Sequence, residues 1–182
     1  KVEKVNPYDS DHPKNEQVIR MFNEIAPNYD RLNGTLSLGI DAYWRRDALT
    51  ELRKYHPRHI LDIATGTGDF AILAQRMLQP EKINAVDISD GMMEIGKEKV
   101  EKRGLGKTIL FENQDCSAMT FADDSFDAAT VAFGVRNFEN IDQSFQEVLR
   151  VLKPGGVFLF LELTTPDKTP MKELYATYTK YV

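Results

Sequence analysis

The segment Leu61-Asp62-Ile63-Ala64-Thr65-Gly66-Thr67-Gly68-Asp69 decides how this chain folds. It joins a short apolar run to a turn of small residues, after which Phe70, Leu73, Ala74 and Met77 recur at helical spacing. The pattern predicts a strand, a sharp glycine turn and a helix. Side chains in such a turn would keep a ligand away, so its glycines allow the backbone to approach one closely.

Downstream of this segment, short apolar runs alternate with helical ones, which is typical of βαβ units and a parallel sheet. We predict strands over residues 60–64, 83–87, 108–112, 126–132 and 157–163. Ser89 is the expected N-cap of one helix, and Lys153-Pro154-Gly155-Gly156 is the expected stop after a helix over 143–152. The right-handed crossover rule favours an open, doubly wound α/β sheet, whose ligands lie at the carboxyl ends of the strands.

The first sixty residues have a different, helical and aromatic character. A helix is expected after Pro13, with Val18, Met21, Phe22 and Ile25 on one face. A second amphipathic helix is expected over 40–55, and an irregular segment over 27–39. The chain is thus expected to form one structural domain with a helical front.

Composition narrows the class of protein. The chain has 182 residues, and 23 Lys and Arg against 28 Asp and Glu give a net charge of −5, which disfavours nucleic-acid binding. The apolar stretch in 157–163, which is uninterrupted only over 157–161, falls far short of the roughly 20 residues of a membrane helix. The single cysteine, Cys116, favours a reducing, cytoplasmic setting, and the scattered histidines His12, His56 and His59 predict no metal site.

Two cofactors compete for the glycine turn. Gly66-x-Gly68-x-x-Ala71, with Asp87 about 20 residues downstream of the turn, satisfies the dinucleotide fingerprint and predicts NAD. S-adenosylmethionine (SAM) is favoured by Asp62, which can face the ammonium of the methionine end, and by Asp115, which can accept from the adenine amino group. The plainer alternatives are that the glycines only form a turn, Asp62 only orders the loop and Asp115 is a turn residue.

Several strings resemble known families. Asp62-x-Ala64-x-Gly66-Thr67-Gly68, Asp87, Asp115-Cys116 and Leu152-Lys153-Pro154-Gly155-Gly156 resemble the class I SAM-dependent methyltransferases. More specific strings resemble the ubiquinone/menaquinone biosynthesis C-methyltransferases from about Phe22 to Pro166. They are Ile25-Ala26-Pro27-Asn28-Tyr29-Asp30-Arg31-Leu32-Asn33, Leu36-Ser37-Leu38-Gly39-Ile40, Trp44-Arg45-Arg46 and Phe133-Gly134-Val135-Arg136-Asn137.

The resemblance implies a SAM pocket built on the strand ends. The residues that it assigns to this pocket are Asp62, Ala64, Gly66, Thr67, Gly68, Asp87, Ile88, Asp115, Cys116 and Ala132. Many relatives have Ser at the position of Ala132, which offers only backbone and a methyl group. Cys116 stands where a small residue is common, so we expect it to pack near the adenine rather than to act as a nucleophile.

The resemblance also implies the reaction, which is C-methylation of a polyprenyl quinol, above all of demethylmenaquinol to menaquinol. The acceptor carbon becomes nucleophilic when a neighbouring phenol loses its proton, and a cation beside the oxygen helps that loss. Arg136 is the expected cation, with Asn137 as a hydrogen-bond donor. Tyr29 and Asp30 are expected to cap the pocket and to orient the quinol or take part in proton removal. The alternatives are that Arg136 pairs with a surface acid such as Glu139, and that Tyr29 packs while Asp30 forms a turn.

The same comparison implies a helical, substrate-side lid over residues 1–58 and a SAM-binding core over 59–182. A prenylated acceptor implies brief contact of the N-terminal helices with the bilayer, so the protein is expected to be cytoplasmic or peripheral at the inner membrane face. Class I sheets normally end with a helix and a strand hairpin, which this sequence does not reach, so we expect an open sheet edge. A non-catalytic SAM-binding subunit and an NAD-dependent oxidoreductase domain are the alternative functions. The sequence indicates no oligomeric state.

Overall fold

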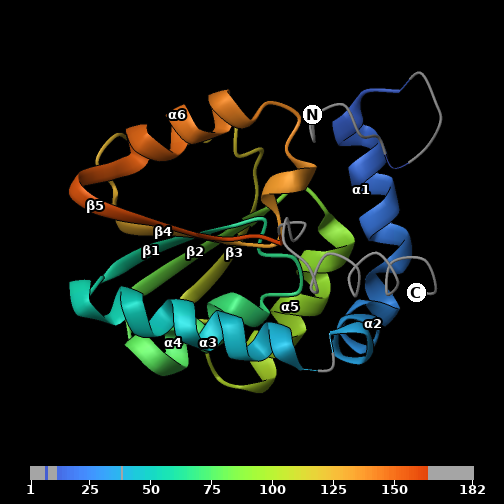
Figure 1. The fold of residues 1–182 in the computed structure, drawn as a ribbon, viewed down its shortest axis with the longest axis horizontal. Helices are drawn as coiled ribbons and strands as arrows, with labels where there is room; N and C mark the ends of the chain where they lie inside the picture. The colour runs from blue at the N-terminus through green and yellow to red at the C-terminus, as the bar shows by residue number, and fades with distance from the viewer. Residues whose placement is uncertain (1–6, 8–11, 38, 164–182) are drawn as a thin grey trace, which may run out of the picture.

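The computed structural model describes residues 7, 12–37 and 39–163. At its centre lies a parallel, five-stranded sheet of order β3-β2-β1-β4-β5 (Figure 1). The strands are β1 (His59–Ile63), β2 (Lys82–Asp87), β3 (Ile109–Asn113), β4 (Phe126–Ala132) and β5 (Leu152–Leu161). The strand order reverses between β1 and β4, so ligands of this sheet are expected beside the end of β1. The predicted doubly wound α/β fold is confirmed.

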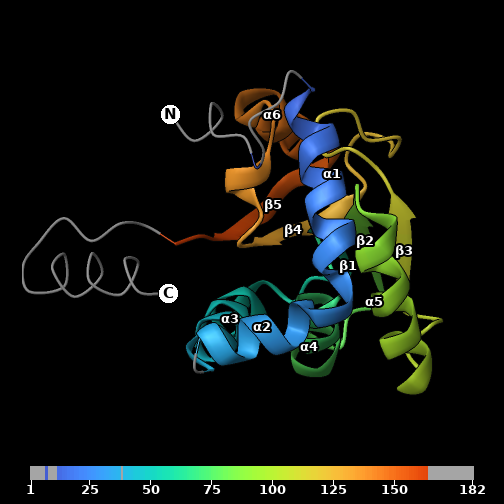
Figure 2. The same cartoon turned by 90° about the vertical axis from the view of Figure 1, so that its right-hand side faces the viewer.

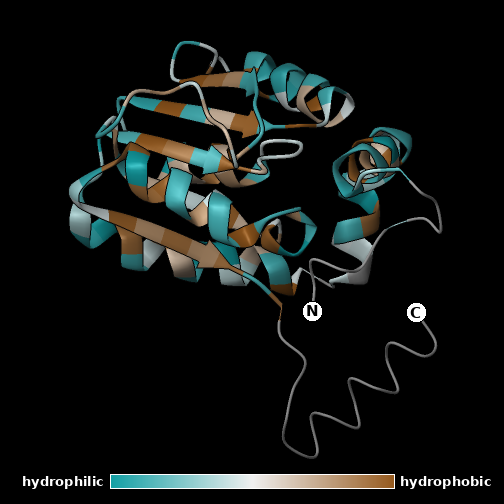
Figure 3. Cartoon of the chain, turned by 90° about the horizontal axis from the view of Figure 1, so that it is seen from above, coloured by the Kyte–Doolittle hydropathy of each residue, from teal (hydrophilic) through white to brown (hydrophobic). Residues whose placement is uncertain are grey.

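Helices cover both faces of the sheet, which explains why the strands are apolar throughout rather than alternating. Ile60 belongs to the core shared with α3 (Ile40–Leu52), α4 (Asp69–Leu78) and α5 (Asp90–Lys102). Leu61 and Ile63 belong to the core shared with α6 (Ile141–Val151) on the opposite face (Figure 1). The helices carry polar residues on their outer sides, while the strands between them are largely apolar (Figure 3).

The N-terminal helices lie at the carboxyl end of the sheet. They are α1 (Lys14–Ile25), the 3-10 turn η2 (Ala26–Asn28) and α2 (Tyr29–Leu36), and a second 3-10 turn, η3 (Arg53–Tyr55), follows α3. Helix α1 crosses in front of the strand ends and contacts α5 (Figure 2). These helices therefore lie where the sheet topology places ligands.

Two local predictions were wrong. Residues 27–39 are not irregular as a whole, because 29–36 form α2. Tyr29 packs edge-on against Phe22, and Asp30 accepts a hydrogen bond from Thr67 of the glycine turn, so tertiary contacts hold this helix in place.

The predicted strand start at 157 is also wrong: α6 ends at Val151, as the stop at 153–156 predicts, but β5 begins at Leu152 and includes the stop residues. Leu152 pairs with Phe126 and Val157 pairs with Ala128, so the four intervening residues form an irregularity in the strand, with Gly155 at φ +81°. The pairing with β4 thus begins before the turn residues and resumes after them.

The described helices include none that is both long enough and apolar enough to cross a bilayer. The last part of the predicted SAM-binding core, residues 164–182, lies outside the described residues. Within the described sheet, β5 forms one edge and β3 the other.

Candidate functional site

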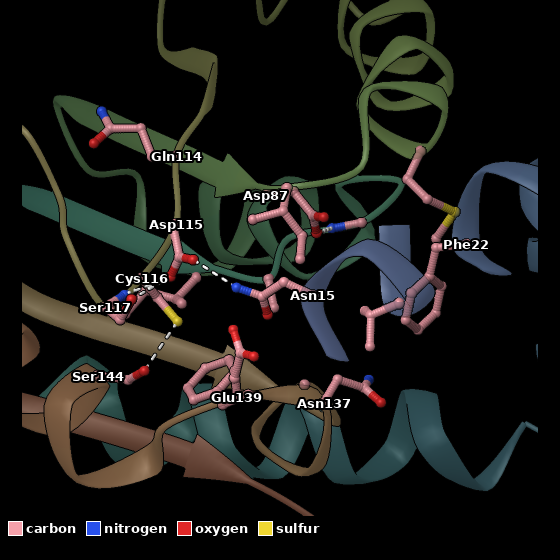
Figure 4. Close-up of a pocket in the computed structure, with 18 of the residues that line it drawn as sticks. Asn15, Phe22, Asp87, Gln114, Asp115, Cys116, Ser117, Asn137, Glu139 and Ser144 are labelled. Carbon is pink, nitrogen blue, oxygen red and sulfur yellow. Dashed lines mark hydrogen bonds between the residues drawn. The ribbon is translucent and has the colours of Figure 1, made fainter. Parts of the chain in front are cut away.

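A cavity of about 310 Å³ lies at the carboxyl ends of β1, β2 and β4, beside the loop that follows β3 (Figure 4). Helix α1 contributes Asn15, Val18 and Phe22 to its wall, and the segment after β4 contributes Asn137 and Phe138. Ligand pockets are commonly of this size and are lined, like this one, by apolar side chains with a few polar groups. The cavity therefore lies where the topology predicts a binding site.

The glycine turn forms one wall, and its backbone requires glycine. Gly66 and Gly68 have φ values of +56° and +75°, which residues with a side chain rarely adopt. Only Gly66 lines the cavity; a Cβ on Gly68 would lie 2.8 Å from the ring of Phe111, so this glycine serves packing. Of the two predicted cofactor-binding glycines, one reaches the site.

Asp87, at the end of β2, holds the turn and faces the cavity. Its Oδ2 accepts from the Gly66 amide at 2.7 Å, and its Oδ1 accepts from the Ser89 amide at 2.9 Å. Burial raises the pKa of this carboxyl, although the hydrogen bonds from the backbone amides oppose the shift. A carboxylate accepts about four hydrogen bonds, so acceptor capacity remains for the hydroxyls of a ribose.

Asp115 and Cys116 follow β3 and line the same cavity. Asp115 Oδ1 accepts from the amide and hydroxyl of Ser117, and its Oδ2 accepts from Asn15 on α1 at 2.8 Å (Figure 4). The Cys116 thiol lies 3.3 Å from the Ser144 hydroxyl, and burial raises its pKa to about 11. The thiol is therefore protonated at neutral pH, in agreement with a packing role.

Asp62 lies on the other side of the turn, beside a smaller cavity of about 40 Å³. Its two oxygens accept from the hydroxyls of Thr65 at 2.6 Å and Thr130 at 2.7 Å. Burial raises its pKa from 3.8 to about 6. Ala64, Gly66, Ala132 and Tyr29 line both cavities, so the two spaces adjoin.

Thr67 and Asp30 meet, but outside the main cavity. The Thr67 hydroxyl donates to Asp30 at 2.7 Å, and Lys99 on α5 contacts Asp30 at 2.7 Å and Asp69 at 2.6 Å. Thr67 lines only the smaller cavity, and Asp30 lines neither. This arrangement fastens α2 to the glycine turn through Asp30, and the role of Asp30 towards the acceptor stays a prediction.

The predicted catalytic residues separate in space. Tyr29 and Asn137 line the main cavity, as do Ala64, Ile88 and Ala132 among the predicted cofactor residues. Arg136 does not line it; its guanidinium is 2.8 Å from Glu162, and its side chain is 45% exposed. The expected alternative partner, Glu139, lines the cavity instead. Sequence spacing could not reveal this, because Arg136 lies in the 3-10 turn η4 (Val135–Asn137), where adjacent side chains diverge.

Residues of α1 that sequence reasoning missed attach this helix to the site. Buried Lys14 donates to the carbonyls of Arg136 and Phe138, at 3.1 and 3.0 Å. Asn23 accepts from the Ser89 hydroxyl at 2.8 Å and from the Gly91 amide at 3.0 Å. Their partners are over 60 positions away in the chain, so no local pattern could reveal them. The available signal in the sequence was that Lys14, Asn15 and Asn23 are polar residues in a helix that also carries an apolar face.

The residues fit SAM. Carboxylates lie at or just after the ends of two neighbouring strands, and apolar side chains from α1 line the same cavity. A Cβ on Gly66 would come within 3.2 Å of the Met92 methyl, which is a tight contact. A nucleoside needs hydroxyl acceptors and a flat apolar slot, and both are present. Within the described residues, no three His, Cys, Asp or Glu side chains gather as metal ligands.

Solved structures resemble the fold. The cyclase SpnF superposes with a TM-score of 0.71 at 22% identity, covering 86% of this chain and 63% of SpnF. A putative SAM-dependent methyltransferase of Methanococcus maripaludis superposes with a TM-score of 0.67 at 21% identity, covering 87% of this chain and 69% of that one. Because a cyclase and a methyltransferase both match, the fold alone does not determine the reaction.

Proteins related in sequence indicate the reaction more specifically than the fold does. A demethylmenaquinone methyltransferase of Bacteroides fragilis is 56% identical over 180 residues, which cover 99% of this chain and 74% of that protein. The ubiquinone/menaquinone biosynthesis C-methyltransferase UbiE of Geobacter sulfurreducens is 43% identical over 166 residues, covering 91% of this chain and 65% of that protein. The profile of the ubiE/COQ5 methyltransferase family matches residues 10–182. The chain therefore belongs to the ubiE/COQ5 methyltransferase family and is a SAM-dependent methyltransferase.

Proposed function

We propose that this enzyme methylates a ring carbon of a polyprenyl quinol, converting demethylmenaquinol to menaquinol. The observation that carries the proposal is the continuity of one cavity, from the strand-end carboxylates Asp87 and Asp115 to Phe133, Tyr29 and Asn137. One end suits a nucleoside, and the other suits an aromatic ring with oxygens. The name of the Bacteroides fragilis relative supports this choice of acceptor.

The chemistry asks the protein mainly to align two reactants and exclude water. When bound, SAM supplies an electrophilic methyl group on a sulfonium. Around it the chain provides Asp87 and Asp115 for the nucleoside and, on α1, Val18 and Phe22, which close the cavity against solvent. Ile88, Cys116 and Ala132 add apolar contact area to the same wall.

The acceptor must lose a phenolic proton, and the groups facing the cavity determine how. Tyr29 and Asn137 are placed to hydrogen-bond the ring oxygens, and we assign them to orienting the quinol. Arg136 stays a prediction for phenolate stabilisation. To reach the cavity, its guanidinium would have to leave Glu162, which lies 2.8 Å away and has a side chain that is 17% exposed.

The proposal is tested with the purified full-length protein, SAM and reduced acceptors of both ring types, by mass spectrometry of the products. Demethylmenaquinol is expected to gain one methyl group, that is, about 14 mass units. Methylation of a benzoquinol alone would replace the acceptor and keep the reaction type. Binding of SAM with neither product formed would favour a non-catalytic SAM-binding subunit.

Two variants separate the acceptor roles. Asn137→Ala is expected to raise KM for the quinol at least about fivefold and to leave SAM affinity unchanged, because one charge-free hydrogen bond to the acceptor is lost. If Arg136 stabilises the phenolate, Arg136→Ala lowers kcat and moves the alkaline rise of kcat to higher pH. Undiminished turnover with an unchanged pH profile would refute that role.

A further inference from the structure

Arg45 on α3 is a cation at the glycine turn that the proposed reaction leaves unused. It lines the smaller cavity, and only 14% of its side chain is exposed. Its NH1 is 3.2 Å from Asp41 and 4.0 Å from Asp69, and its guanidinium carbon lies 5.5 Å from the centre of the Phe133 ring. Its Nε is buried and has no hydrogen-bond partner within the described residues.

An unpaired buried N–H on a charged group is costly and requires an explanation, and an anion bound to the guanidinium would supply one. Asp41 engages one corner of the guanidinium fork, whereas the Nε edge, which suits a carboxylate, is unused. The smaller cavity of about 40 Å³ exceeds the space that one water molecule needs. The site therefore has room for a small anionic group.

The strand order indicates which part of SAM reaches this cation. Asp115 follows β3 and Asp87 ends β2, and the next strand in the sheet is β1, followed by β4. Neighbouring strands are about 4.8 Å apart. A ligand with its base at Asp115 and its ribose at Asp87 therefore extends towards the end of β1, where the two cavities adjoin at Ala64 and Gly66.

The charges at this end match the amino-acid part of SAM, which carries one ammonium and one carboxylate. The smaller cavity is lined by the cation Arg45 and by the acids Asp62 and Asp69. We propose that the Arg45 guanidinium binds the carboxylate of the amino-acid end of SAM and thereby selects the intact amino-acid group. This inference uses the SAM dependence of the enzyme and does not depend on which quinol is methylated.

A competing explanation is that Arg45 only supports the turn through Asp41 and Asp69. Binding measurements on the ligand-free full-length protein separate the two, with SAM compared against decarboxylated SAM, which lacks only the carboxylate. The wild-type protein is expected to bind decarboxylated SAM about tenfold or more weakly, because a charge-assisted hydrogen bond is lost. Equal affinity of the wild-type protein for both ligands would overturn the proposal without any variant.

The variant Arg45→Met assigns the effect to this residue. It is expected to weaken SAM binding about tenfold or more and to leave the affinity for decarboxylated SAM within about twofold. Arg46→Met, on the exposed side of the same helix, is the matched control and should change neither affinity. Equal weakening of both ligands by Arg45→Met would mean that Arg45 supports only the shape of the pocket.

Arg45→Lys keeps the proposal testable if the methionine variant does not fold. A lysine keeps the charge but not the fork, so the ratio of the two affinities is expected to fall towards one. An unchanged ratio would show that another group binds the carboxylate. The readout is a ratio of two binding affinities. This test therefore still applies if the protein does not methylate demethylmenaquinol.

Discussion

Two aspartates on neighbouring strands show how the surroundings of a carboxyl group determine its hydrogen bonds and its pKa. Asp87 accepts from backbone amides and faces the main cavity, whereas Asp62 accepts from the hydroxyls of Thr65 and Thr130 and is 2% exposed. Both carboxyls have a raised pKa because burial disfavours their charged form. The same residue type thus accepts from backbone amides beside the main cavity at one strand and from hydroxyls beside the smaller cavity at the next.

The raised pKa of Asp62 predicts a pH-dependent stability. With a pKa of about 6 when folded and 3.8 when free, Asp62 binds its proton more tightly in the folded state. Its contribution to the free energy of unfolding is therefore fully present below about pH 4 and is lost as the pH rises through 6, by about 3 kcal/mol.

Urea unfolding of the wild-type protein and Asp62→Asn between pH 4 and 7 measures this contribution. As the pH rises, the free energy of unfolding of the wild-type protein should fall relative to that of Asp62→Asn, since the asparagine amide does not titrate. A difference that stays constant over this range would contradict the raised pKa.

At the scale of elements, close packing of α5 on the glycine turn positions the site. Gly96 lies in α5, where a Cβ would come within 2.6 Å of the Phe111 ring and 3.1 Å of the Thr67 carbonyl carbon. A side chain there would push α5 away from the turn. The Lys99 contacts to Asp30 and Asp69 depend on the same approach.

Gly96→Ala is accordingly expected to destabilise the fold by about 1–3 kcal/mol through overpacking, and to weaken SAM binding because the turn shifts. Gly106→Ala is the matched control, because a Cβ there meets nothing within 4 Å and its φ is not positive. Denaturant unfolding and SAM titration of both variants measure the effects. Equal stabilities of the two variants would show that the packing between α5 and the glycine turn can accommodate a Cβ at this position.

At the scale of the whole molecule, α1 connects segments that follow three different strands at the carboxyl end of the sheet. Lys14 holds the segment after β4, Asn15 holds Asp115 after β3, and Asn23 holds the start of α5. Of the predicted lid over residues 1–58, α3 packs into the core on one face of the sheet, so we propose that α1 and α2 act as the lid on this core. If the lid opens, these hydrogen bonds of Lys14, Asn15 and Asn23 would break, and they would form again when it closes.

Hydrogen exchange with and without SAM tests the lid. Amides of α1 and α2 should exchange at least about fivefold more slowly with SAM bound, while those of β1 and β4 stay unchanged, because local opening is confined to the lid. Lys14→Met should speed exchange of α1 in the free protein, since two donors are lost, whereas Arg20→Met, at an exposed i,i+4 pair with Glu24, should not. Uniform slowing across the sheet would indicate general stabilisation instead of a lid.

The sequence by itself determined the fold class, the strand ends and the cofactor-bearing loop, because these depend on local signals. Apolar runs, helical spacing and glycines with positive φ act over a few residues. Asp87 ends a strand that its own residues predict, whereas Asp115 and Cys116, which come two and three residues after β3, were assigned from the family resemblance.

Only the tertiary structure decided which side chains face the site. Arg136 pairs with Glu162, Asp30 clamps the turn, and Arg45 approaches from α3, each through a partner more than twenty positions away. Such contacts depend on how helices pack across the sheet, and no local pattern encodes them. A lysine buried against carbonyls over 120 residues away is therefore visible only once the chain has folded.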